Sequence, residues 1–284
     1  MTSIQIICPS CGDKGNIEVA PDALKHVTRG LLAINIPAST ICQHSFIAYL
    51  DRNLHVRDYF VADFQIELPE MPIPDSEKFR ESKIPSKDIV DIDLIKLNMT
   101  ALLLTHVLKS IFSRQKTLLI IDYEFLFQHI HNFFDYVTRD TFDTQITIIT
   151  ENDYNKDKKQ YKDYMVLKGN EIVKNVNKIL NDKKLGVEKH IVSKFLTEQE
   201  LGYSYILLKN EIQKAYELST SIVEFVKDKK KSNEKANILE ASANLEQKYS
   251  IKISPMYLNF LNEIVKNYYG MTVPSASQSF LGSL

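Results

Sequence analysis

The stretch Cys8-Pro9-Ser10-Cys11-Gly12 is followed further along the chain by Cys42-Gln43-His44, and together they contain every cysteine of the protein. Two thiolates three residues apart on a tight turn can bind one ion together, and the glycine after them permits the backbone conformation of such a turn. Three thiolates and one imidazole satisfy a tetrahedral zinc ion. We therefore predict a zinc site formed by Cys8, Cys11, Cys42 and His44. Four protein ligands leave no position open for a substrate, so the predicted site is structural.

The fourth ligand has alternatives, because His26 and His55 belong to the same part of the chain as the cysteines. Iron also binds to cysteine knuckles, although an imidazole ligand favours zinc. The competing interpretation of the two stretches is three ordinary buried cysteines that bind no metal.

The sequence around these ligands predicts a small antiparallel sheet in an amino-terminal module, residues 1–68. Apolar residues alternate with polar ones, and turn residues separate the segments. The expected strands run through residues 4–6, 17–19, 31–37, 45–50, 54–56 and 61–66. Residues 21–29 are expected to form one short helix, with Pro21 near its first turn.

Residues 69–90 are expected to be a linker, because Pro69, Pro72, Pro74 and Pro85 lie there among charged residues. After this segment the pattern changes to that of an α/β domain, residues 91–185. Helices are expected over 99–113 and 123–137, and strands over 117–121, 145–149 and 163–167. The apolar character of these strands favours central positions that are covered on both faces.

Residues 186–270 are expected to be helical, and residues 271–284 to form a flexible tail. Thr197 and Glu200 have the spacing of a capping box, which predicts a helix that begins there. A heptad-like apolar stripe follows over 201–226, and it packs either within its own domain or against a second copy of the chain. Two further helices are expected, one through Ile238, Ala241 and Leu245, and one that begins at Ser254-Pro255 and ends at Gly270.

The composition of the chain is that of a folded soluble protein. Its 284 residues are 44% hydrophobic, and 35 Lys and Arg residues nearly balance 36 Asp and Glu residues. No apolar run reaches the length of a membrane helix, and the first residues lack the pattern of a signal peptide. We therefore expect a cytoplasmic protein with an α/β, or more broadly α+β, fold: a β module, an α/β layered domain and a helical region.

Several classes of activity lack their usual motifs. The 8 glycines form no phosphate-binding loop, and no GxSxG nucleophile elbow occurs. Asp122, Glu151 and Asp153 lie at predicted strand ends, where carboxylates can act in catalysis or bind magnesium, but turn and cap roles explain them equally well. The sequence thus gives no positive sign of an enzyme.

The charged residues are unevenly distributed along the chain. Residues 91–153 have a net charge of −4 and residues 154–235 a net charge of +6. The second stretch contains the run Asn155 to Lys162, in which lysine and tyrosine are interleaved, and such runs can bind nucleic acid. The amino-terminal module is net acidic and lacks the basic cluster that phosphate contacts need. Nucleic-acid binding through 154–235 is therefore a third functional hypothesis.

The amino-terminal module resembles a module of uncharacterised archaeal proteins. The shared features are the CPSCG knuckle, the CQH pair and a hairpin in which Asp51, Asn53, Val56 and Arg57 form the pattern D-x-N-x-x-V-R. This resemblance implies a zinc module and an archaeal origin, and it implies no activity.

The middle of the chain resembles the core of DENN domains, which regulate small GTPases by nucleotide exchange. The resemblance rests on the order of elements from ALLLTHVLKSIFSRQKTLLIID at residue 101, through Gln145 to Ile149, to Tyr164-Met-Val-Leu-Lys-Gly169. The chain has no tryptophan after Phe142 and no Pro-Phe before Gly169, where DENN domains carry them.

The first functional hypothesis is a zinc-binding scaffold or regulatory adaptor that acts through protein–protein contacts. The second is a DENN-like regulator of a small GTPase.

Overall fold

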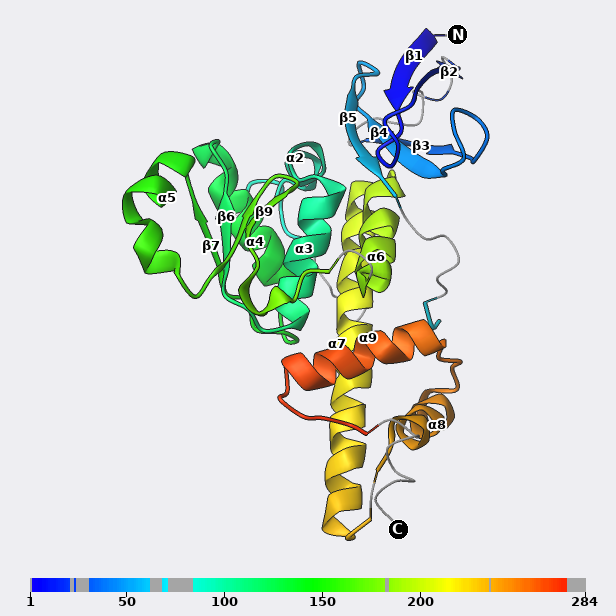
Figure 1. Ribbon diagram of the computed structural model, residues 1–284, viewed down its shortest axis with the longest axis vertical. Helices are drawn as coiled ribbons and strands as arrows, with labels where there is room; N and C mark the ends of the chain where they lie inside the picture. The colour runs from blue at the N-terminus through cyan, green and yellow to red at the C-terminus, as the bar shows by residue number, and fades with distance from the viewer. Residues whose placement is uncertain are drawn as a thin grey trace.

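The computed structural model describes residues 2–20, 23, 31–61, 68–70, 84–181, 184–234 and 236–274. Over these residues the protein has an α+β fold with three small sheets, and the long helix α7 connects its upper and lower parts (Figure 1). The expected helix over 21–29, most of the strand over 61–66, most of the Pro-rich segment and the end of the tail lie outside the described residues.

The amino-terminal module contains two antiparallel sheets, where the sequence predicted one. Strands β1 (Thr2–Ile7) and β2 (Lys14–Val19) form a hairpin, and β3 (Leu32–Ile36), β4 (Phe46–Leu50) and β5 (Val56–Phe60) form a second sheet in that order. The expected strand over 54–56 is wrong, because Leu54 has a positive φ of 61° and belongs to the turn. The chain pairs again only from Val56, so β5 continues to Phe60.

Asp51 organises the turn between β4 and β5. Its carboxylate accepts hydrogen bonds from the N–H of Asn53 at 2.8 Å and of His55 at 3.0 Å, and from Arg57 Nε at 2.8 Å. Burial opposes ionisation of Asp51, but these donors lower its pKa below the ordinary value. The D-x-N-x-x-V-R pattern is therefore a local hydrogen-bonding arrangement that fixes a hairpin.

The central part of the chain contains helices α2 (Ile92–Asn98), α3 (Ala101–Phe112), α4 (Phe127–Val137) and α5 (Glu151–Asp157). Its strands are β6 (Thr117–Ile120), β7 (Ile146–Ile149), β8 (Met165–Lys168) and β9 (Glu171–Lys174). The sheet order is β7-β6-β8-β9; β6 is parallel to β7 and β8, and β9 is antiparallel to β8. The sequence pattern did not predict α2, α5 or β9.

The two faces of this sheet are covered differently. Leu119 belongs to the main buried cluster with residues of α3 and α4, whereas Leu118 and Ile120 pack with Tyr154 of α5 on the opposite face. Alternate side chains of one strand point to opposite faces, so α4 and α5 cover different sides. The expected central position is correct for β6 and β8, but β7 is a half-buried edge strand.

The carboxyl-terminal part consists of α6 (Gly186–Thr197), α7 (Leu201–Lys231), α8 (Ile238–Tyr249) and α9 (Pro255–Asn267). The predicted capping box is wrong: Thr197 is the last residue of α6, and Glu200 caps α7 by accepting from the N–H groups of Gly202 and Tyr203. The start of α9 is confirmed, because Ser254 caps it and Pro255 is its first residue.

The heptad-like stripe of α7 is buried within the chain. The stripe begins at the half-buried Leu201, and its seven other positions are buried, namely Tyr205, Leu208, Ile212, Ala215, Ser219, Ile222 and Val226. Helix α7 packs against α6, α8 and α9 and contacts α2 and α4. A dimer through this stripe would have to displace these helices, so the packing observed is the intramolecular alternative.

One buried cluster runs through all three predicted parts of the chain. Ile47, Tyr49 and Phe60 of the amino-terminal module belong to it together with residues of α3, α6, α7 and α9. The carboxylate of Asp58 on β5 also accepts a hydrogen bond of 2.7 Å from the N–H of Ala101, the first residue of α3. The module is thus attached by burial and by a helix cap, while the predicted domain boundaries stay predictions.

Among the described residues, no single helix is long and apolar enough to cross a membrane. Helices α2 and α3 reach that length and apolarity only as a pair, and they are bent by 108° to one another.

Lys96 on α2 is a buried cation where the central part of the chain meets α6. Its side chain is 2% exposed, its Nζ donates to the backbone oxygen of Glu198 at 2.6 Å, and it lies 5.0 Å from the ring centre of Phe195. Burial lowers the pKa of Lys96 to about 8, although Glu198, Asp93 and Glu200 oppose the shift.

We expect the free energy of unfolding to rise between pH 8 and pH 10.5, because the unfolded chain then holds a proton on Lys96 that the folded chain has released. Full titration corresponds to roughly 3 kcal/mol. Urea unfolding across this window should show the rise in the wild type and in the control Lys87→Met, whose lysine is exposed, but not in Lys96→Met. An equal rise in Lys96→Met would contradict the expectation.

Candidate metal centre

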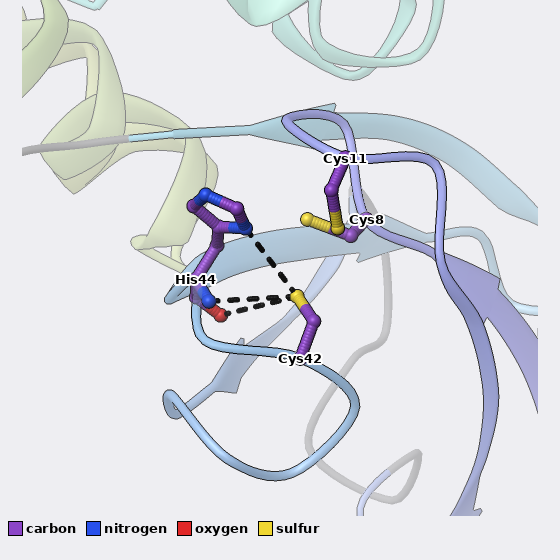
Figure 2. A group of neighbouring side chains, drawn as sticks. All are labelled: Cys8, Cys11, Cys42 and His44. Atoms are coloured by element: carbon purple, nitrogen blue, oxygen red, sulfur yellow. Dashed lines mark hydrogen bonds between the residues drawn. The ribbon is translucent and has the colours of Figure 1, made fainter.

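The first two predicted ligands lie in the turn that joins β1 to β2. The N–H of Cys8 donates to the backbone oxygen of Asp13 at 2.8 Å, and the N–H of Gly12 donates to that of Cys8 at 2.9 Å. Gly12 has a φ of +79°, which a residue with a Cβ adopts only with strain, so the predicted role of this glycine is confirmed. The turn holds both thiols on the same side of the hairpin (Figure 2).

The other two predicted ligands lie in the loop between β3 and β4. His44 Nδ1 lies 3.6 Å from Cys42 Sγ, and the N–H of His44 donates to the same sulfur at 3.4 Å. Figure 2 shows the imidazole and the Cys42 thiol turned toward each other and toward the β1–β2 turn.

The fold brings these four side chains together. One ligand atom from each of Cys8, Cys11, Cys42 and His44 lies within 4.8 Å of all the others. Cys8 is buried and Cys42 half-buried, whereas Cys11 and His44 are exposed. The four groups can therefore bind one metal ion between two turns that belong to different sheets.

The electrostatics of the thiols favours a cation at their centre. Burial opposes ionisation of Cys8, but the N–H groups of Cys11 and Ser10 point at its sulfur, and with neighbouring thiols they lower its pKa to about 7. The N–H of Asp13 lowers the pKa of Cys11, yet desolvation and the sulfurs of Cys42 and Cys8 raise it to about 12. Three thiolates this close repel one another, and a divalent cation removes that repulsion.

The alternative fourth ligands do not join this group among the described residues. His55 is on the β4–β5 turn, where its side chain is 75% exposed and its Nδ1 lies 3.7 Å from Asp51 Oδ2. His26 lies outside the described residues. The sequence favoured His44 but left the other two histidines open, because the choice depends on which turns pack together.

Gly15 on β2 lets the two ligand turns approach each other. A Cβ at this position would lie 2.8 Å from Cγ1 of Ile41, the residue before Cys42. Local sequence patterns do not point to Gly15, because the residue that requires a glycine there, Ile41, lies in the loop between β3 and β4. The only feature of the sequence near Gly15 that could have pointed to it is its position three residues after Gly12 of the knuckle.

We expect Gly15→Ala to weaken metal binding about tenfold or more, because Ile41 must move and carries Cys42 with it. Competition with a chromophoric chelator measures the affinity. The matched control is Asn16→Ala on the same strand, where the side chain is exposed. Equal affinities in the two variants would show that the close approach of Gly15 to Ile41 is unimportant.

The carboxylates considered for catalysis have structural partners. Asp122 Oδ1 accepts from the N–H of Glu151 at 3.2 Å, and Glu151 forms an ion pair of 2.6 Å with Lys168. Asp153 pairs with Lys156 at 3.1 Å and accepts from the hydroxyl of Thr150, which caps α5. These contacts account for all three carboxylates as cap and ion-pair residues.

The lysine- and tyrosine-rich run over 155–162 forms part of a small core. Tyr161 packs with Tyr154 and Tyr164 against the sheet, with ring centres 6.2 Å and 5.4 Å apart. The lysines of the run are exposed, but its tyrosine is not free to stack on bases.

No family model matches this chain, and no significant similarity to a curated protein or to a solved structure was found. The resemblances to archaeal modules and to DENN domains therefore stay predictions from the sequence.

Proposed function

We propose that the protein is a cytoplasmic scaffold or regulatory adaptor whose amino-terminal module is held together by a structural zinc ion. The observation that carries the zinc proposal is the convergence of Cys8, Cys11, Cys42 and His44 within 4.8 Å. A Cys₃His set is typical of tetrahedral structural zinc, and its imidazole makes iron the less favoured metal.

The proposed role of the ion is to join the β1–β2 hairpin to the second sheet, beside the hydrophobic cluster that the two share. An isolated two-stranded hairpin such as β1–β2 is marginally stable in water. Its described attachments are the small cluster around Ile6 and Phe46 and a hydrogen bond of 3.0 Å from the N–H of Ile7 to the Tyr59 hydroxyl oxygen. Ligands from both turns would fix the first hairpin on the second sheet.

The adaptor role is supported by the closed ligand set and by the shared core. With four protein ligands the metal offers no open position, and the three candidate carboxylates are engaged in caps and ion pairs. Because the module is buried against α3 and α6, its surface is presented in a fixed orientation relative to the helices.

The test of this proposal combines metal analysis with affinity capture. Purified protein should contain about one zinc ion per chain. Capture from the source cytoplasm after nuclease treatment should enrich protein partners, and a Cys8→Ser/Cys42→Ser variant should lose the partners that need an intact module. Recovery of no protein would argue against the adaptor. Recovery of partners only when nucleic acid is intact would argue for the nucleic-acid hypothesis instead.

The second candidate is a DENN-like regulator of a small GTPase. The order α3, β6, α4, β7 and β8 supports it, since the sequence resemblance rests on this order of elements. Such a regulator remodels the nucleotide site of its partner and needs no phosphate loop of its own. Faster release of labelled GDP from small GTPases of the source organism would support it, and unchanged release across that set would argue against it.

A further inference from the structure

The loop after β6 exposes two aromatic side chains. Tyr123 and Phe125 are each 62% exposed, and their ring centres lie 6.0 Å apart with the ring planes tilted by 52°. The backbone that carries them is fixed in position. The N–H of Leu126 donates to the backbone oxygen of Tyr123 at 3.0 Å, and the Leu126 side chain is buried at the start of α4. The pair is thus a fixed feature of the surface that the core does not require.

The charge around this pair is negative. Asp122 and Glu124, the residues on either side of Tyr123, are exposed carboxylates, and residues 117–138 contain no Lys or Arg. Asp135 of the same stretch lies further along α4 and is paired with His131 at 3.1 Å. Lys168 reaches the same end of the sheet, but it is paired with Glu151. Two tilted rings beside the exposed carboxylates of Asp122 and Glu124 favour a cation, which can lie within about 6 Å of both ring centres.

This loop lies where the sheet changes its winding direction. Ile120 is in register with Ile149, so the segments that follow β6 and β7 leave the sheet at the same end, that of the strands' carboxyl termini. They lead to α4 and α5, which cover opposite faces. In open α/β sheets, ligands bind at such a point, outside the carboxyl ends of the strands.

Strand β7 adds a second binding feature beside the pair. Of the strands that the structure describes, only β6 pairs with it, so β7 is an edge of the sheet. Its sequence, Ile146-Thr-Ile-Ile149, has neither the charges nor the proline that protect edge strands from pairing with another chain. An extended peptide can add to such an edge through backbone hydrogen bonds.

We propose that this edge binds an extended basic segment of a partner protein. The segment adds to β7 as a further strand and places a Lys or Arg side chain between Tyr123 and Phe125. An added strand lies two strand spacings, about 10 Å, from β6, and an extended Lys or Arg side chain and an aromatic ring, each about 6 Å long, span this distance together. This inference rests on the proposed adaptor function and names its contact surface and the chemistry of its partner; an acidic surface does not suit nucleic acid.

The test uses the full chain and three fluorescein-labelled peptides of about nine residues. The first alternates Val and Arg, the second alternates Val and Glu, and the third is the basic peptide with Pro in place of Val. Anisotropy titration should show saturable binding of the first peptide only. Tyr123→Ala/Phe125→Ala should weaken this binding about tenfold. The matched control is Tyr203→Ala, which removes an aromatic residue that is 50% exposed on α7 and should leave the affinity unchanged.

Three results would each overturn the proposal. The first is equal affinity of the wild type and the double variant for the basic peptide, and the second is comparable binding of the Val-Glu or proline peptide. The third is no saturable binding of the basic peptide up to about 1 mM. Thermal unfolding of the double variant near the wild-type temperature excludes misfolding as the cause of a loss. The adaptor proposal fails separately, since it is judged by nuclease-resistant capture. Partners captured equally by the wild type and the double variant would leave the adaptor intact and exclude this edge.

Discussion

Cys8→Ser is expected to abolish metal binding and to unfold the β1–β2 hairpin. Cys8 is the buried member of the four candidate ligands, with 1% of its surface exposed, and its sulfur accepts the N–H of Ser10 at 3.4 Å. Structural zinc in small modules contributes on the order of 10 kcal/mol to folding. Without the ion, a two-stranded hairpin and a small hydrophobic cluster remain to hold this end of the chain.

Two measurements check this expectation. Elemental analysis should find about one zinc ion per chain in the wild type and almost none in the variant. Hydrogen exchange should show lost protection of the β1 and β2 amides, while α7 and α9 stay protected. Their core residues are packed with other helices, away from the metal. A chelator added to the wild type should reproduce the pattern.

The matched control is Ser10→Ala in the same turn. Only the backbone N–H of Ser10 contacts Cys8, so loss of the hydroxyl should change neither metal content nor exchange. Full metal content in Cys8→Ser, or unchanged protection of β1 after the metal is lost, would contradict a structural role for this site.

Lys109→Met is expected to destabilise the protein by about 3–5 kcal/mol. Lys109 on α3 is 3% exposed and lies 3.1 Å from Glu188 of α6, which is fully buried. It also forms an ion pair with Glu263 of α9. Removing the lysine leaves the Glu188 carboxylate without its cation in the interior, and that uncompensated charge is the main cost.

The pH dependence of this loss has a definite sign. Burial raises the pKa of Glu188, and Lys109 is the main group that opposes the shift. Without Lys109, the folded variant should bind a proton on Glu188 at a pH where the unfolded chain has released it. The stability of Lys109→Met relative to the wild type should therefore fall as the pH rises above the ordinary Glu value.

Urea unfolding of a variant set checks the assignment. Lys109→Met/Glu188→Leu should recover much of the lost stability, because neither charge then remains buried. Glu263→Gln should cost less, since the Glu263 side chain is 32% exposed and can be hydrated. A double variant no more stable than Lys109→Met would show that the ion pair is not the source of the loss.

The features predicted correctly from sequence are those set by local patterns. The four candidate ligands were named from residue type and spacing, and they cluster within 4.8 Å of one another. The CPSCG turn places two of the thiols together whatever surrounds it. The cap at Ser254-Pro255 was correct for the same reason, since a serine side chain reaches only the next helical turn. Apolar period likewise identified α3, the buried stripe of α7 and strands β6 and β8.

The errors arose where two local interpretations compete. Thr197 and Glu200 have capping-box spacing, yet α6 extends to Thr197, and Glu200 caps α7 itself. The strand expected at Leu54 became a turn, because Asp51 accepts the N–H groups that such a strand would need for pairing. The apolar residues of β7 predicted a central strand, but β7 lies at the edge of the sheet, because a strand's position is set by its pairing partners.

By itself, the sequence determined the α+β class, the two cysteines of the knuckle turn and the main helices, because residue period and turn chemistry act over a few neighbouring residues. Tertiary structure alone decided that His44 and not His55 joins the cysteines, that Gly15 must be small beside Ile41, and that Lys96 and Lys109 are buried. Each of these depends on contacts between segments far apart in the chain, and such contacts leave no periodic trace in either segment.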